Sequence, residues 1–201
     1  AIVTGGTSGA NSNNKIYINT INKCNYGIAF SGFAATAGLN PADADISNDV
    51  GGATSATGNT ITNFGLSTGT GIVAAGGIYA SNQWSMNISN NTITSGTHLA
   101  NLYGVITKGG AGANIDINNN TINLTSNGSG TTVFGIDNTI GAANSANNVN
   151  INNNKISGSY TTATNGGFYG IYNRAGASNF NANGNQFGGA TSPITHTSTS
   201  G

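Results

Sequence analysis

Residues 86–93 read Met-Asn-Ile-Ser-Asn-Asn-Thr-Ile, and 29 residues later residues 115–122 read Ile-Asp-Ile-Asn-Asn-Asn-Thr-Ile. Each stretch places apolar residues at alternate positions, then an Asn pair, then one polar residue and an isoleucine. The alternation predicts a short strand with one buried face. The Asn pair predicts a bend, because Asn and Gly adopt left-handed backbone conformations at little cost. The unit is therefore a strand, a bend and a second strand.

The bend occurs six times along the chain, with Asn always in its second place and Asn or Gly in its first. The apolar residues that end successive copies are 45, 32, 29, 34 and 31 residues apart. A fixed pattern with variable filling predicts a solenoid whose repeats share one cross-section and differ in their loops. The copies are Asn13-Asn14-Lys15-Ile16, Gly58-Asn59-Thr60-Ile61, Asn90-Asn91-Thr92-Ile93, Asn119-Asn120-Thr121-Ile122, Asn153-Asn154-Lys155-Ile156 and Gly184-Asn185-Gln186-Phe187.

A second pattern, an aromatic residue followed by Gly and Ile or Val, falls between the copies of the first. Its copies are Tyr26-Gly27-Ile28, Gly76-Gly77-Ile78, Tyr103-Gly104-Val105, Phe134-Gly135-Ile136 and Tyr169-Gly170-Ile171. Each repeat then contains three short strands. Strands that stack from repeat to repeat run parallel, and parallel crossovers are right-handed. We therefore predict an all-β fold, a right-handed parallel β-helix of about six coils.

The Asn in the second place of each bend is predicted to point inward and to form a ladder. Stacked coils are about 4.8 Å apart, so each side-chain amide can donate to one neighbour and accept from the other. Buried amides would then all be satisfied. The predicted ladder consists of Asn14, Asn59, Asn91, Asn120, Asn154 and Asn185.

Composition restricts the partners and the domain organisation. The 201 residues fit one domain, only 5% of them are charged and the net charge is zero, so we expect no nucleic-acid partner. Apolar runs are short, which argues against membrane insertion, and the one cysteine, Cys24, excludes an internal disulfide. Because no capping sequence is apparent, residues 1–201 are expected to be a segment of a longer chain, with 191–201 a tail or linker.

The Asn-Asn-x-Ile and aromatic-Gly-Ile copies resemble the parallel β-helix repeats of the pectin-lyase-like superfold. The low-charge composition, rich in Asn, Thr and Gly, resembles repeat regions of large secreted surface proteins of Bacteroidetes-type bacteria. The resemblance covers residues 11 to about 190 and implies an extracellular or cell-surface location. It leaves the function open, since the superfold includes lyases, hydrolases, tailspikes, adhesins and inert stalks.

No catalytic residues are predicted. The resemblance implies that a pectin-cleaving member would carry a cluster of Asp, and acid–base chemistry needs carboxylates a few ångströms apart. Asp116 and Asp137 both point outward, but from different strands of a coil. The acidic residues Asp43, Asp45 and Asp49 fall in the long loop of the first repeat. They are a weak candidate metal site, with calcium as the one conceivable cofactor, and the preferred interpretation is a solvated loop.

Threonines that flank the buried isoleucines give the most informative predicted surface. The residues expected to stack in register on this face are Thr60, Thr62, Thr92, Thr94, Thr121 and Asn123. A flat Thr-x-Thr array resembles the ice-binding face of β-helical antifreeze proteins. It is interrupted in the fifth copy by Lys155, and Thr is also a common residue on any solvated strand.

The aromatic residues of the second pattern are interpreted as a structural ladder. Tyr172 is expected to point outward, but one outward aromatic does not make a sugar site. The first hypothesis is therefore a non-enzymatic extracellular rod, structural or adhesive, with flanking repeats of the same protein and surface glycans as candidate partners. An ice-binding protein is the first alternative. A polysaccharide-binding or polysaccharide-cleaving protein is the second.

Overall fold

The computed structural model describes residues 11–32, 44–66, 72–141, 147–162, 166–174, 179–189 and 193–198. These residues form short strands joined by bends, together with one 3-10 turn, η3 (Ser55–Thr57). Within the described ranges the chain forms no helix that is long and apolar enough to cross a membrane. The fold is therefore all-β.

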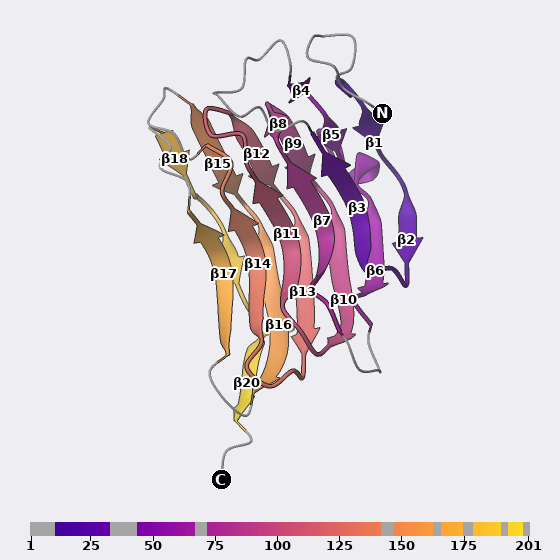
Figure 1. The fold of residues 1–201 in the computed structure, drawn as a ribbon, viewed down its shortest axis with the longest axis vertical. Coiled ribbons are helices and arrows are strands. Elements are labelled where there is room, and N and C mark those ends of the chain that lie inside the picture. Colours follow the sequence, from indigo (N-terminus) through magenta and orange to yellow (C-terminus); the bar gives the residue numbers. More distant parts are fainter. Residues whose placement is uncertain are drawn as a thin grey trace.

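The strands stack into three main sheets, in which every neighbouring pair runs parallel (Figure 1). Sheet A contains β1 (Lys15–Ile16), β5 (Asp49–Val50), β9 (Met86–Ser89), β12 (Ile115–Asn118), β15 (Asn148–Asn152) and β18 (Asn179–Asn181). Sheet B contains β2 (Thr20–Asn22), β6 (Thr60–Phe64), β10 (Thr92–His98), β13 (Thr121–Ser126), β16 (Lys155–Thr162), β19 (Gln186–Phe187) and β20 (Ile194–Ser198).

Sheet C contains β3 (Tyr26–Ser31), β7 (Ala75–Ser81), β11 (Leu102–Lys108), β14 (Thr132–Asn138) and β17 (Gly167–Asn173). A small sheet D pairs β4 (Asp45–Ile46) with β8 (Gln83–Trp84). The chain visits A, then B, then C, and returns to A one strand further along. This path through stacked parallel sheets is compatible with a parallel β-helix.

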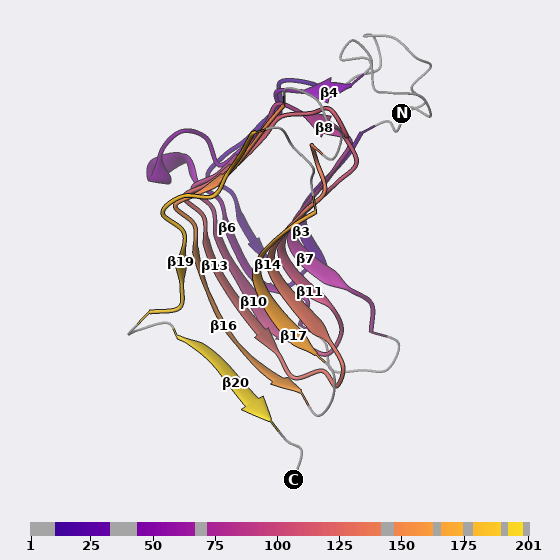
Figure 2. The same cartoon turned by 90° about the vertical axis from the view of Figure 1, so that its left-hand side faces the viewer.

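The core lies between the three sheets and consists of apolar residues in register from strand to strand. Sheet B contributes Ile61, Ile93, Ile122 and Ile156 at one level, each at most 1% exposed. Figure 2 shows sheets B and C on opposite sides of this interior. Like side chains therefore stack on like, as the repeat predicts. The matching rows are Val50, Ile88, Ile117 and Ile151 in sheet A, and Ile28, Ile78, Val105 and Ile136 in sheet C.

The glycine of the aromatic-Gly-Ile pattern is required by close packing. A Cβ atom on Gly104 would lie 2.5 Å from the carbonyl oxygen of Gly135 and 2.6 Å from Cγ2 of Ile122. Gly77 and Gly135 meet the corresponding isoleucines of sheet B at comparable distances. Here sheet C bends against sheet B, so no side chain fits in the middle place of the pattern.

Strand β20 includes part of the stretch predicted to be a tail or linker. Residues 194–198 pair in parallel with the second half of β16, next to β19, which pairs with its first half. The neutral polar sequence of this segment gives little periodicity, so its pairing is not visible without the neighbouring strand.

Candidate functional site

The most regular polar feature is the predicted Asn ladder, which is present and buried. Asn59 Nδ2 donates to Oδ1 of Asn91 at 2.9 Å. The same hydrogen bond joins Asn91 to Asn120, Asn120 to Asn154 and Asn154 to Asn185, each at 3.0 Å. Each Oδ1 also accepts from the backbone N–H of the preceding ladder Asn. The second Nδ2 hydrogen goes to a backbone carbonyl, such as that of Ile88 for Asn120. From Asn59 to Asn154 the amides are therefore satisfied while almost fully buried, and Asn185 is half-buried.

The first rung of the ladder was predicted wrongly, because Asn19 and not Asn14 occupies it. Asn19 Nδ2 donates to Asn59 Oδ1 at 3.0 Å. Asn14 lies at a different corner of the first circuit, where β1 belongs to sheet A, and it donates to Asn48 at 3.0 Å. Asn48 Nδ2 in turn donates to Gln83 Oε1 at 2.7 Å, so a second, shorter amide ladder supports that corner.

The reason for this error is local. Ile18 precedes Asn19 and has φ 57°, so the left-handed place of the bend is filled by a β-branched residue instead of Asn or Gly. Asn13 and Asn14 satisfy the sequence pattern and also form a left-handed bend, with φ 60° at Asn13. The same left-handed bend thus occurs at two corners of the circuit. The sequence pattern alone does not distinguish the corner of the long ladder from the other.

The interpretation of a solvated acidic loop is wrong for Asp45 and Asp49, which lie in the short strands β4 and β5 and are held by protein donors. Asp45 is 5% exposed and accepts from the backbone of Asn11 and the side chain of Gln83. Asp49 accepts from Tyr17, Asn87 and the backbone of Gly52. Asp43 lies outside the described residues. A calcium ion at Asp45 or Asp49 would have to displace these donors, and the described residues contain no group of three metal-binding side chains.

The remaining carboxylates do not form a catalytic pair. Asp116 lies exposed on sheet A and accepts from Asn150 at 2.7 Å, whereas Asp137 belongs to sheet C. Burial raises the pKa of the Cys24 thiol, which disfavours the thiolate that a nucleophile needs. His98 is buried, with its ring nitrogens beside the carbonyl oxygens of Gly65 and Val73.

The predicted threonine face is the outward side of sheet B. Thr60, Thr92 and Thr121 are register partners, and so are Thr62, Thr94 and Asn123. The structure extends both rows by one strand, because Thr20 pairs with Thr60 and Asn22 pairs with Thr62. The rows continue into Lys155 and Ser157 on β16. The six predicted residues therefore lie together on β6, β10 and β13, and Thr20 and Asn22 on β2 extend the array to four strands.

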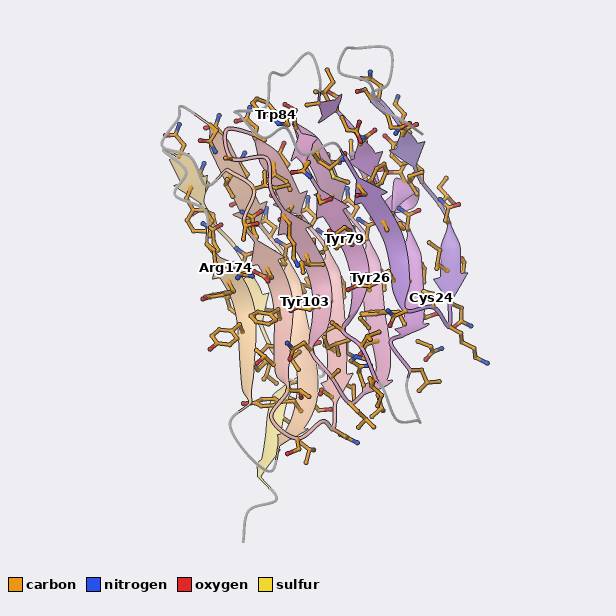
Figure 3. The ribbon with its side chains drawn as sticks, in the orientation of Figure 1. Cys24, Tyr26, Tyr79, Trp84, Tyr103 and Arg174 are labelled. Atoms are coloured by element: carbon orange, nitrogen blue, oxygen red, sulfur yellow. The ribbon has the colours of Figure 1, made fainter. Side chains whose placement is uncertain are left out.

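Sheet C carries a second outward surface, here called the aromatic face and made of Tyr26, Tyr79, Tyr103, Phe134, Tyr169 and Tyr172. Tyr103 stacks on Phe134 at 5.0 Å between ring centroids, and Phe134 stacks on Tyr169 at 5.2 Å. Tyr169 is 45% exposed and Tyr172 is 39% exposed. Figure 3 shows Tyr26, Tyr79 and Tyr103 along this sheet, with Arg174 at its far side.

The aromatic face forms two rows with one gap. Tyr26, Gly76, Tyr103, Phe134 and Tyr169 occupy one place on successive strands. Gly76 has no side chain, and the ring of Tyr26 lies about 3 Å from the position of its missing Cβ. Tyr79 meets the Tyr26 ring edge-on. The second row, Tyr79, Ile106, Asp137 and Tyr172, runs beside the first.

A charged pair is built into this surface. Asp137 is only 1% exposed, and Arg174, whose side chain is 45% exposed, binds both of its carboxylate oxygens. The guanidinium also lies over the ring of Tyr172, 5.1 Å from the centroid. Hydrogen bonding to Asp137 raises the pKa of Arg174, and burial raises the pKa of Tyr103. The pair is thus neutral overall and sits among aromatic rings.

Sequence reasoning treated the first aromatic row as structural and missed the surface as a whole. The sequence does carry one signal of this surface. A tyrosine follows three residues after the first place of the aromatic-Gly-Ile pattern in two copies, at Tyr79 and Tyr172. The glycine bend breaks the period of two, so residues three apart point outward together. The only tryptophan, Trp84, is half-buried in sheet D and is not part of this face.

Comparison with known proteins does not assign the chain to a family. No family model matches the sequence, and neither a curated protein nor a solved structure matches it.

Proposed function

We propose that the chain is a non-enzymatic structural or adhesive rod of an extracellular or cell-surface protein. In this proposal the stacked sheets form a right-handed parallel β-helix of six coils, similar to the pectin-lyase-like superfold, that joins flanking repeats of the same protein. The observation that supports it most is the Asn ladder, which runs along the bend between sheets A and B from Asn19 to Asn185 and is buried from Asn59 to Asn154.

Two features of the structure support this proposal, the contacts that hold successive circuits together and the surroundings of the carboxylates. A continuous set of satisfied amides and stacked apolar rows holds each circuit to the next, so stability adds along the axis. The described carboxylates are either hydrogen-bonded to amides or paired with Arg174, as for Asp116 and Asp137. Neither arrangement offers an acid and a base facing one substrate.

Pulling a single molecule from its termini tests the load-bearing role. Equivalent positions Thr92, Thr121 and Lys155 are 29 and 34 residues apart. Each peeled circuit should therefore lengthen the chain in a step of about 100–120 Å. Smooth extension without steps would overturn the rod. Release of reducing sugars from polysaccharides, lost in Asp116→Asn, would overturn the non-enzymatic role.

Ice binding is the second candidate, and the register of the threonine face favours it. Thr20, Thr60, Thr92 and Thr121 repeat at the strand spacing of about 4.8 Å on one sheet. The test is inhibition of ice recrystallisation by the purified chain. Ice binding predicts inhibition that is lost in Thr92→Leu/Thr121→Leu and kept in Tyr169→Ala. An inactive parent chain would reject this candidate.

A further inference from the structure

We propose that the aromatic face of sheet C binds a neutral glycan chain, which would give the rod an adhesive role. The inference rests on the proposed function, since it supplies the partner of the rod. It begins from the outward row of stacked rings, Tyr103, Phe134 and Tyr169, and from the exposure of Tyr169 and Tyr172, at 45% and 39%, on the end strand of the sheet. Contiguous exposed aromatic residues mark an interaction site more often than isolated ones do.

The size of the face favours a thin, extended ligand. Its longer row crosses five strands, a length of about 19 Å, and the two rows lie three residues apart, a width of about 10 Å. The resulting area of about 200 Å² is far below the roughly 800 Å² that each partner buries in a typical stable protein complex. A folded partner or a second copy of the chain would therefore gain too little contact here.

The hydrogen bonding of the sheet argues against an extended peptide. A peptide that adds a strand needs free backbone donors and acceptors at a sheet edge. β7, β11 and β14 are paired with neighbouring strands on both edges, so over these strands the face offers side chains only, whereas β17 is the end strand of the sheet and pairs with β14 alone. Tyrosine rings and hydroxyls suit a ligand that is apolar on its ring faces and carries hydroxyl groups at its rim, which describes a sugar.

The charge pattern favours a neutral sugar. Arg174 lies over the ring of Tyr172, and its charge is compensated by Asp137. The ion pair also fixes Tyr172, whose ring packs at 5.2 Å from Tyr169 and 5.7 Å from Phe134. Lys108 lies further along β11, beyond both rows. The binding surface is thus rigid before the ligand arrives, which lowers the entropic cost of binding.

Retention on insoluble polysaccharides tests the proposal. The purified full chain is mixed with cellulose, chitin, xylan, mannan, starch and, as an acidic probe, polygalacturonate. We expect retention on at least one neutral polymer, weakened tenfold or more in Tyr169→Ala/Tyr172→Ala and largely kept in Tyr169→Phe/Tyr172→Phe. Thr92→Ala/Thr121→Ala on the opposite sheet is the matched control and should bind like the parent chain.

Three results would overturn the proposal. They are no retention on any neutral polymer, equal retention of the Tyr→Ala variant, and retention on polygalacturonate alone that Lys108→Ala abolishes. Sedimentation of a dimer that dissociates in the Tyr→Ala variant would instead make the face an interface between copies. A stepwise force trace from a chain that binds no glycan would leave the rod standing and reject only this site, so the two failures are distinguishable.

Discussion

At the scale of single residues, Asn120 is the best test of the ladder, since it lies in its middle and is fully buried. Replacement by Leu removes the acceptor of two Asn91 donors and the donor to Ile88. Each buried group left unsatisfied should cost about 1–3 kcal/mol of unfolding free energy. Thermal and denaturant unfolding measure the loss. Asn123→Leu, on the exposed side of β13, the strand that follows Asn120, is the control, and equal effects of the two changes would contradict the ladder.

The residue scale also shows what could be read from the sequence. Asn91, Asn120 and Asn154 were placed correctly, because each follows a left-handed Asn and precedes a buried isoleucine. Asn19 was missed since Ile18 replaces the expected Asn or Gly. Backbone strain that the surrounding structure imposes on Ile18 leaves no mark in the residue types, so only the strand register identifies this rung.

At the scale of elements, the close approach of sheets B and C depends on Gly104. In Gly104→Ala the new Cβ would lie 2.6 Å from Ile122 Cγ2 and 2.5 Å from a backbone oxygen. We expect a loss of about 1–3 kcal/mol from overpacking, measured by denaturant unfolding. Gly189→Ala serves for comparison, because its added Cβ would meet only the flexible end of Gln186. If the two variants unfold alike, the close approach of the sheets is wrong.

The aromatic row of sheet C makes a second prediction at this scale. Burial, and then the nearby Asp137 carboxylate, raise the pKa of Tyr103 above its usual value. The folded protein therefore holds this proton more tightly, so its stabilising effect is complete below about pH 10 and disappears as pH rises further. Spectrophotometric titration should show a late tyrosinate component that shrinks in Tyr103→Phe. An unchanged late component would contradict the packing of this row.

Elements with regular periodicity were predictable, and those defined by their neighbours were not. Strands β9, β12 and β13 follow from alternating apolar residues and the bends between them. Strand β20 and the short pair β4–β8 are polar or brief, and they exist because an adjacent strand offers unpaired backbone groups. The aromatic face likewise needed the glycine bend, which changes which residues point outward.

At the scale of the whole molecule, one scaffold carries two outward surfaces. Sheet B presents threonines and sheet C presents tyrosines, and the stacked isoleucines lie between them, while the ladder lies at the bend between sheets A and B. A circuit contacts only the circuits before and after it, so these surfaces can change without altering the core. This separation explains why the sequence specifies the scaffold clearly and its partners weakly.

Hydrogen exchange of the side-chain amides, followed by NMR, tests the central claim most directly. If a buried ladder holds the circuits together, the Nδ2 protons of Asn59, Asn91, Asn120 and Asn154 should exchange far more slowly than those of the exposed Asn123. Their protection should fall towards Asn185, where the described chain offers Nδ2 only the carbonyl of Ile151. Exchange of all these amides at the rate of Asn123 would contradict the ladder and, with it, the stacked rod.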